Sequence, residues 1–272
     1  MRRFLRNGLA VFGLLTVATF LIIALTAPFI TQFAPAEVSY TDITKAPSSQ
    51  HWFGTDELGR DVFARVVYGA RLSLSVGFLA ILFASISGTF FGIVSGYLGG
   101  WVDEIIMRLV DAMLALPFLV LAIVVAAVLG PSLQNTILAI AIVSLPGFAR
   151  IARGEVLAVK ERDFVQAANA LGAGVPRTLL RHILPNISGP LIVQVTLGVA
   201  QAILTESSLA FLGLGVQPPT PAWGAMLNTA KGYLDIAPWM ALFPGLAIFL
   251  AVLGLSLLGD GLREAFNPRQ RA

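Results

Sequence analysis

The chain has 272 residues, of which 57% are hydrophobic and only 12% carry a charge. A soluble domain is about half apolar and about a quarter charged, so this composition predicts an integral membrane protein and argues against a soluble enzyme. The net charge of +3 comes from basic residues spread over several segments, which argues against nucleic-acid binding, and the lack of cysteine excludes thiol catalysis, thiolate metal sites and disulfides.

Apolar stretches long enough to cross a bilayer recur along the whole chain. A span needs roughly 20 mostly apolar residues. Cutting these runs at Gly130-Pro131 and at the proline-rich segment 217–221 predicts an all-α polytopic protein with six transmembrane helices. We expect them near residues 9–30, 73–98, 108–129, 133–150, 188–213 and 238–258.

The first of these runs also resembles a secretory signal peptide. Arginines precede it, and Ala34-Pro35-Ala36 resembles a cleavage site. The apolar stretch 9–30 is longer than the usual core of about 7 to 15 residues. We therefore expect an uncleaved first helix.

The distribution of Lys and Arg predicts the orientation, because basic residues near spans are retained on the cytoplasmic side. With six spans, one face holds Arg2, Arg3, Arg6, Arg108, Arg150, Arg153, Lys160, Arg162, Arg177, Arg181, Arg263, Arg269 and Arg271. The other face holds far fewer: Lys45, Arg60, Arg65, Arg71 and Lys231. Both termini are therefore expected in the cytoplasm.

The polar segment 31–71 is the one sizeable external stretch that this topology predicts. Thr55 is placed to cap a short helix, and Asp61 and Arg65 have the favourable spacing for an ion pair on a helix. An apolar stripe made of Val62, Phe63, Val66 and Val67 would lie on the membrane or on neighbouring spans. The segment fits a structural plug, and the alternative is contact with an external receptor through Asp56, Glu57, Arg60 and Asp61.

Four glycines of the second predicted span, Gly88, Gly92, Gly96 and Gly100, repeat every four residues on one helix face. Helices in lipid associate through close backbone approach, so this face is expected to pack against another helix, either in this chain or in another subunit. Next in the chain, Arg108 and Asp111 are spaced to pair at a solvated helix end, with Pro117 inside the third span.

The loop 150–186 is too polar for lipid and too patterned for a linker. One helix is expected from about Val156 to Leu171, ended by Gly172, with Phe164, Ala168 and Leu171 on a shared face. After the turn, Pro176 suits the start of a second helix that ends at Pro185. A helical hairpin that projects from a membrane bundle indicates a docking element.

Several segments resemble the permeases of binding-protein-dependent ABC importers, in the dipeptide, oligopeptide and nickel branch. Gln166-Ala167-Ala168, Gly172 and Leu184-Pro185 resemble the family's Glu-Ala-Ala…Gly…Ile-x-Leu-Pro loop. Gln166 stands where the family often has Glu, and His182 where it often has Ile. The stretches 51–61, 68–74, 206–224, 259–263 and 267–268 resemble further family segments, from the external loop to the C-terminal signature.

The resemblance implies a type I ABC importer permease in the bacterial inner membrane. It implies an N-terminal helix with an external loop at 1–71, a transmembrane domain at 72–260 and a cytoplasmic tail at 261–272. Within the coupling loop 150–186, the family's short helix lies in a cleft of the ATPase. The residues assigned to this loop are Asp163, Phe164, Gln166, Ala167, Ala168, Leu171, Gly172, Ala173, Gly174, Pro176, Leu184 and Pro185.

The resemblance also implies the partners. A second, homologous permease would pair with this chain, two ATPase subunits would bind ATP and Mg, and an external substrate-binding protein would deliver peptides. The sequence has no Gly-x4-Gly-Lys-Ser/Thr phosphate loop, so neither an enzymatic centre nor a cofactor is expected in this chain.

Two residue types bear on the cargo. Glu206, an acid inside the fifth span, either lines the translocation path or fixes the bundle by bonding Ser or Thr neighbours. His51 and His182 fall on opposite membrane faces, so no metal site is expected and peptide is favoured over nickel, which stays the alternative cargo.

Function classes outside this family fit less well. An ion-coupled secondary transporter usually shows internal repeats and charged broken helices, and the sequence shows neither. An intramembrane enzyme would need a nucleophile with its base or a metal pair, and the sequence contains no such motif.

Overall fold

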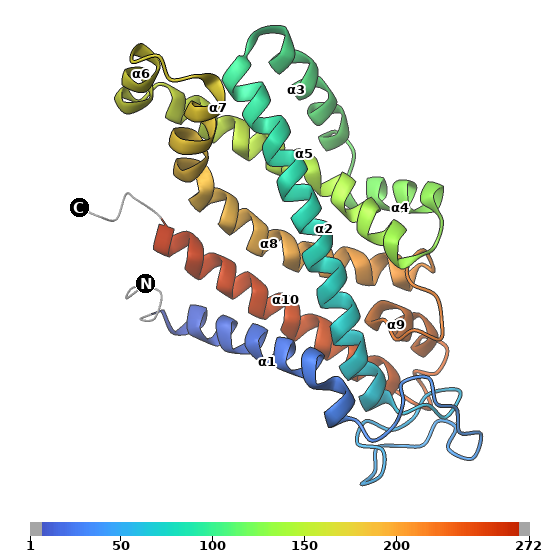
Figure 1. The fold of residues 1–272 in the computed structure, drawn as a ribbon. Coiled ribbons are helices and arrows are strands. Elements are labelled where there is room, and N and C mark those ends of the chain that lie inside the picture. Colours follow the sequence, from blue (N-terminus) through green and yellow to red (C-terminus); the bar gives the residue numbers. More distant parts are fainter. Residues whose placement is uncertain (1–6, 267–272) are drawn as a thin grey trace.

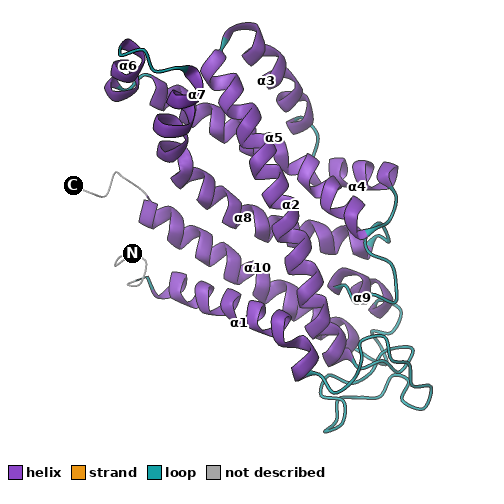
Figure 2. Ribbon diagram, in the orientation of Figure 1, coloured by secondary structure: helices purple, strands orange, loops and turns teal. Residues whose placement is uncertain are grey.

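The computed structural model describes residues 7–266, and within them every regular element is a helix. The helices are α1 (Gly8–Ile30), α2 (Val62–Leu98), α3 (Gly100–Leu114), α4 (Phe118–Leu129), α5 (Leu133–Lys160), α6 (Asp163–Ala170), α7 (Val175–Thr178), α8 (Leu184–Phe211), α9 (Trp223–Ala230) and α10 (Trp239–Phe266), with a π-helical turn at Leu179–Ile183 before α8 (Figures 1 and 2). Some predicted positions lie outside the described residues: Arg2, Arg3, Arg6, Asn267, Pro268, Arg269 and Arg271.

Five helices of the described chain are long and apolar enough to cross a membrane, and a bent pair gives up to six spans. That pair is α3 and α4, which the sequence predicted as a single helix over 108–129. The prediction is wrong, because the chain bends by 95° between them. Pro117 caused the break: proline lacks the N–H of a helix interior and disfavours helical backbone at the residue before it.

The remaining spans lie where the sequence predicted them, but most extend further. The second begins at Val62, the fourth continues to Lys160 and the sixth to Phe266. The fifth begins at Leu184, so Pro185 stands in its first turn, where a missing N–H costs little. The predicted helix end at Pro185 is therefore wrong.

The helices share two ends (Figure 1). The start of α1 meets the end of α10, where the side-chain amide of Asn7 donates to the Glu264 carboxylate at 2.8 Å. Helices α6 and α7 lie at this same end, called the hairpin end below. Residues 31–61 and α9 lie opposite, at what is called the loop end. The first and last described helices thus begin and finish at one face, as an even number of spans requires.

Helices α2 and α5 are packed backbone to backbone. A Cβ added at Gly88 would lie 2.6 Å from the Leu145 carbonyl oxygen, and one at Gly92 only 2.4 Å from that of Ala149. Gly96 makes a similar approach, at 3.0 Å from the carbonyl of Arg153. The partner of the predicted glycine face is therefore internal. Gly100 does not belong to this face, because it begins α3 at φ +55 with open space where a Cβ would lie.

Candidate functional site

The hairpin end carries a short helix held slightly apart from the bundle. Helix α5 ends at Lys160, Arg162 is extended, and α6 begins at Asp163, so the predicted continuous helix from Val156 to Leu171 is wrong. A continuous helix would place Val165 roughly 120° around the axis from Val159. The break lets both valines be buried, and Asp163 places a negative charge at the N-terminus of the new helix.

Gly172 ends α6, as the sequence predicted. Its φ of +80 lies in the left-handed region, which costs glycine little and other residues more. The amide of Ala173 donates to the Ala168 carbonyl at 3.0 Å, and the amide of Gly172 donates to that of Asn169 at 2.9 Å. These two bonds form a Schellman motif, which satisfies the final carbonyls of the helix.

The hairpin, which consists of α6, α7 and the π-helical turn that follows them, exposes several large apolar side chains. Leu171 is 89% exposed and Leu180 is 67% exposed, while Phe164 and Val175 are each more than two-fifths exposed. The hairpin is nevertheless built in a fixed way, because Val165 and Thr178 are buried and the Thr178 hydroxyl donates to the Asn169 side chain at 3.0 Å. A fixed element with an apolar outer face fits contact with another protein.

Ion pairs connect α3 to α5 near the hairpin. Both oxygens of Asp103 accept from the Arg153 guanidinium at 2.6 Å, and Asp111 accepts from Arg150 at 2.6 Å. The predicted pair of Arg108 with Asp111 is therefore wrong, since Arg108 lies 3.7 Å from Glu104. These two ion pairs therefore join α5 to α3 at the hairpin end.

Two cavities follow one another along α5 and α8, and together they form what is called the α5–α8 groove. The first, of about 460 Å³, lies near mid-helix and is lined by Ile81, Leu114, Phe118, Val143, Ser144, Gly147, Phe148, Gln194, Leu197, Gly198 and Gln201. The second, of about 470 Å³, reaches the hairpin end and is lined by Ile151, Glu155, Pro190, Val193, Gln194, Leu197, Arg263 and Phe266. Gln194 and Leu197 line both cavities.

Glu206 lies in α8 beyond the groove, toward the loop end, and is fully buried. One carboxylate oxygen accepts from the Ser73 hydroxyl of α2 at 2.9 Å and lies 3.4 Å from the Ser207 hydroxyl. Within the described chain its other oxygen has no hydrogen-bond partner. These serine contacts agree with the role of fixing the bundle, and Glu206 does not line the groove.

At the loop end, three of the four residues considered for receptor contact bond one another. Asp56 accepts from the Arg60 guanidinium at 2.7 Å and lies 3.4 Å from that of Arg65. Glu57 accepts from Arg60 at 2.5 Å. Asp56, Arg60 and Asp61 are each about 5% exposed, so most of the set predicted to meet a receptor is buried.

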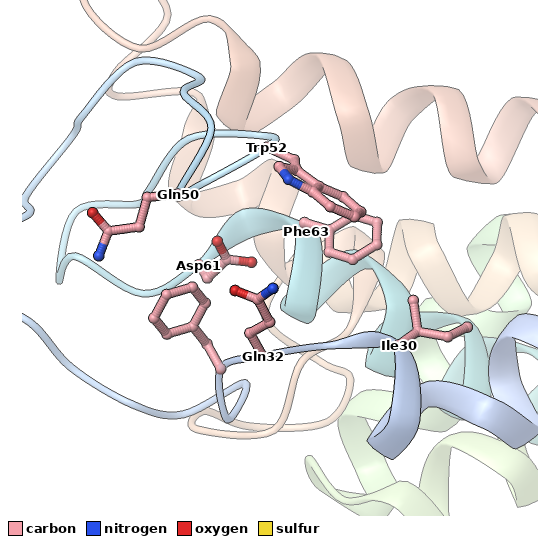
Figure 3. A pocket seen from close by; sticks show the side chains of 7 residues that line it. Ile30, Gln32, Gln50, Trp52, Asp61 and Phe63 are labelled. Atoms are coloured by element: carbon pink, nitrogen blue, oxygen red, sulfur yellow. The ribbon is translucent and has the colours of Figure 1, made fainter.

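The start of α2 also differs from the prediction. Asp61, not Thr55, is the N-cap, and it accepts from the Ala64 amide at 2.7 Å. Its second oxygen lies 2.9 Å from His51 Nδ1, so no pair forms with Arg65. Figure 3 shows Asp61 in a small pocket with Gln32, Gln50, Trp52 and Phe63, but this pocket has little free volume.

Burial and hydrogen bonding set two pKa values at this end. The ammonium of Lys45 and the hydroxyl of Ser39 lower the pKa of Asp42 to about 2. Burial, reinforced by the neighbouring Asp56 carboxylate, raises the pKa of Glu57 above its usual range.

Gln194 and Gln201 were not among the site residues predicted from the sequence. They are seven residues apart, which places them on one face of α8, two turns from each other. That spacing within an apolar span was the available signal.

Comparison with known proteins places this geometry in a family. Residues 88–272 match the family described as the binding-protein-dependent transport system inner membrane component. Residues 1–47 match the N-terminal transmembrane domain of oligopeptide transport permease C. The chain belongs to this family of inner-membrane permeases. It is therefore a multi-pass transport subunit of the bacterial inner membrane.

Named relatives cover nearly the whole chain. A dipeptide transport system permease protein of Alkalihalophilus pseudofirmus is 49% identical over 98% of this chain and 88% of its own length. A glutathione transport system permease protein of Escherichia coli is 46% identical over 98% and 89% respectively. An inward-facing structure of the MetNI methionine ABC transporter superposes with a TM-score of 0.60 at 16% identity, covering 75% of this chain and 96% of that one. That likeness confirms the predicted ABC importer permease fold.

Proposed function

We propose that this chain is one permease subunit of an ATP-driven importer for dipeptides and oligopeptides. Relatives named for dipeptide and glutathione transport, each more than 40% identical over almost the full length, support peptide as the cargo. Glutathione is itself a tripeptide, so both names point to one substrate class.

The hairpin end is proposed to lie in the cytoplasm. The basic residues described there, among them Arg150, Arg153, Lys160, Arg162 and Arg177, favour this orientation. Both termini would then be cytoplasmic, and residues 31–61 would face outside.

The exposed apolar surface of the hairpin is the observation on which we propose that the hairpin couples ATP hydrolysis to transport. Leu171 and Phe164 expose apolar surface at a glycine-capped tip, which supports docking in a cleft of a partner. We propose that this partner is one of two ATPase subunits that bind ATP and Mg. A homologous permease would complete the membrane domain, and an external binding protein would deliver the cargo. The coupling residues named from the sequence all lie in or beside this hairpin.

Uptake by the complete transporter in proteoliposomes tests the proposal. With the binding protein outside and ATP enclosed, labelled alanyl-alanine should accumulate, and it should not accumulate when ATP is withheld. Accumulation driven by an ion gradient alone would contradict ATP coupling. Uptake of nickel in place of the peptide would favour the alternative cargo.

A further inference from the structure

The α5–α8 groove runs from the middle of the bundle toward the hairpin end. Gln201 lies in the mid-helix cavity, Gln194 lies where the two cavities meet, and Pro190 lies in the second one. On α8 these residues succeed one another toward Leu184, where the helix begins. The two cavities therefore lie next to each other along one route that reaches the hairpin end.

The middle of this route is polar without being charged. Among the described residues that line the mid-helix cavity, the polar ones are Ser144, Gln194 and Gln201. None of these three side chains forms a hydrogen bond with another described residue. Ser144 and Gln194 are half-buried and Gln201 is exposed. Their donors and acceptors are therefore free to bond a ligand that enters the groove with complementary groups.

The spacing of the two amides fits a short peptide. Seven residues of helix separate them by roughly 10 Å along the axis of α8. An extended chain spans at most about 3.3 to 3.6 Å per residue, so two or three residues cover about 7 to 11 Å. A glutamine side chain both donates and accepts, which matches the N–H and C=O groups of a peptide backbone.

Charged residues appear only where the described groove reaches the hairpin end. Glu155 and Arg263 line the second cavity, and no ion pair joins them among residues 7–266. Their opposite signs favour neither cationic nor anionic cargo.

We propose that Gln194, Gln201 and Ser144 form a charge-neutral site in the translocation route that binds the peptide backbone of cargo irrespective of side-chain charge. The inference rests on the proposed function, because it names the residues that meet the peptide. Its consequence is that the receptor, and not the membrane domain, selects among side chains.

The test changes the charge of this site and compares cargoes of opposite charge. The complete transporter carrying Gln201→Lys or Gln201→Glu is assayed in proteoliposomes with alanyl-lysine, alanyl-glutamate and alanyl-glutamine. Ratios of uptake between variant and wild type cancel the receptor's own preference. We expect Gln201→Lys to slow alanyl-lysine about three- to tenfold relative to alanyl-glutamate, Gln201→Glu to do the reverse, and wild type to transport all three at rates within about threefold once the receptor is saturated.

Gln134→Lys is the matched control, because Gln134 is exposed at the start of α5 and lines neither cavity. It should leave the ratios unchanged. Gln201→Leu with Gln194→Leu should slow all three peptides by a similar factor while the complex stays assembled.

Equal effects on all three cargoes in both charged variants would overturn the proposal. So would loss of the second permease from the purified double variant, Gln201→Leu with Gln194→Leu, since that would assign the amides to the interface between permeases. Failure of the proposed function is distinguishable, because wild type would then show no ATP-dependent uptake of any of the three peptides.

Discussion

The two ends of the molecule differ in how far their side chains are buried and hydrogen-bonded within the chain itself. At the loop end, Asp56 accepts from the Arg60 guanidinium and from two backbone amides while almost wholly buried. Trp239 and Trp223 donate their indole N–H groups to the carbonyls of Thr55 and Val66. At the hairpin end, Leu171 is almost wholly exposed, and Phe164 of α6 exposes about two-fifths of its surface.

This difference indicates that the loop end contributes to the stability of the chain and that the hairpin end contributes to binding a partner. Buried charges that bond one another fix the loop end without any second protein. Exposed leucines on a rigid turn gain nothing until another surface covers them. A variant at the loop end should therefore change unfolding, and a variant at the hairpin tip should change assembly.

The largest effect is expected from Asp56→Ala at the loop end. Without this carboxylate, Arg60 and Arg65 lose their shared partner in a buried site, and such a loss costs about 3 to 5 kcal/mol. Chemical unfolding in detergent measures it. Asp163→Ala, which removes an exposed acid at the hairpin end, is the control and should cost less than about 1 kcal/mol. Equal losses would erase the proposed contrast.

A smaller effect is expected from Leu171→Asp at the hairpin tip. A buried charge in a contact centre costs about 2 kcal/mol or more, which weakens ATPase binding on the order of 30-fold. Co-purification of the ATPase subunits measures it, and the unfolding midpoint should not change. Tyr40→Asp, at a residue 78% exposed at the loop end, should retain the ATPases. If both variants retained the ATPase subunits, the hairpin would not be part of the interface with them.

The turn itself is tested by Gly172→Ala. Its φ of +80 costs an L side chain about 1 to 2 kcal/mol, although the space around it is free. Hydrogen exchange in residues 163–178 should therefore accelerate. Gly174→Ala, at φ −67 with open space, is the matched control and should change nothing. Identical exchange in the two variants would mean that the left-handed turn does not hold the hairpin.

The smallest effect concerns Glu57 and pH. Because folding raises its pKa, the folded protein binds this proton more tightly, so the contribution to stability is full below the unfolded value near 4.5 and is lost as pH rises through the folded value. Glu57→Gln should flatten the fall in stability above pH 4.5. Unfolding midpoints of both proteins across that range measure it, and parallel curves would contradict the assignment.

Much of the fold followed from the sequence because apolar length and helix stops are local signals. The spans were located, Gly172 was identified as a stop, and the close approach at Gly88, Gly92 and Gly96 was expected. The bend at Pro117 was missed, since a proline within a span is compatible with a kink, a break or a continued helix.

The candidate sites were less predictable because they depend on pairing across the fold. The spacing of Asp61 and Arg65 allowed an ion pair on one helix. The actual partner of Asp61 is His51, which comes from a loop whose path the sequence does not define. Gln194 and Gln201 can be recognised as lining a groove only once the position of α5 beside α8 is known. Burial of Asp56 and Arg60 likewise depends on helices far along the chain.

A single engineered cysteine tests the central claim most directly, because the natural chain has none. With a short bifunctional reagent on the complete transporter, Leu171→Cys should cross-link to an ATPase subunit, and Lys45→Cys at the loop end should not. Cross-linking of the ATPase from Lys45→Cys but not from Leu171→Cys would show that the hairpin end is not the energy-coupling end.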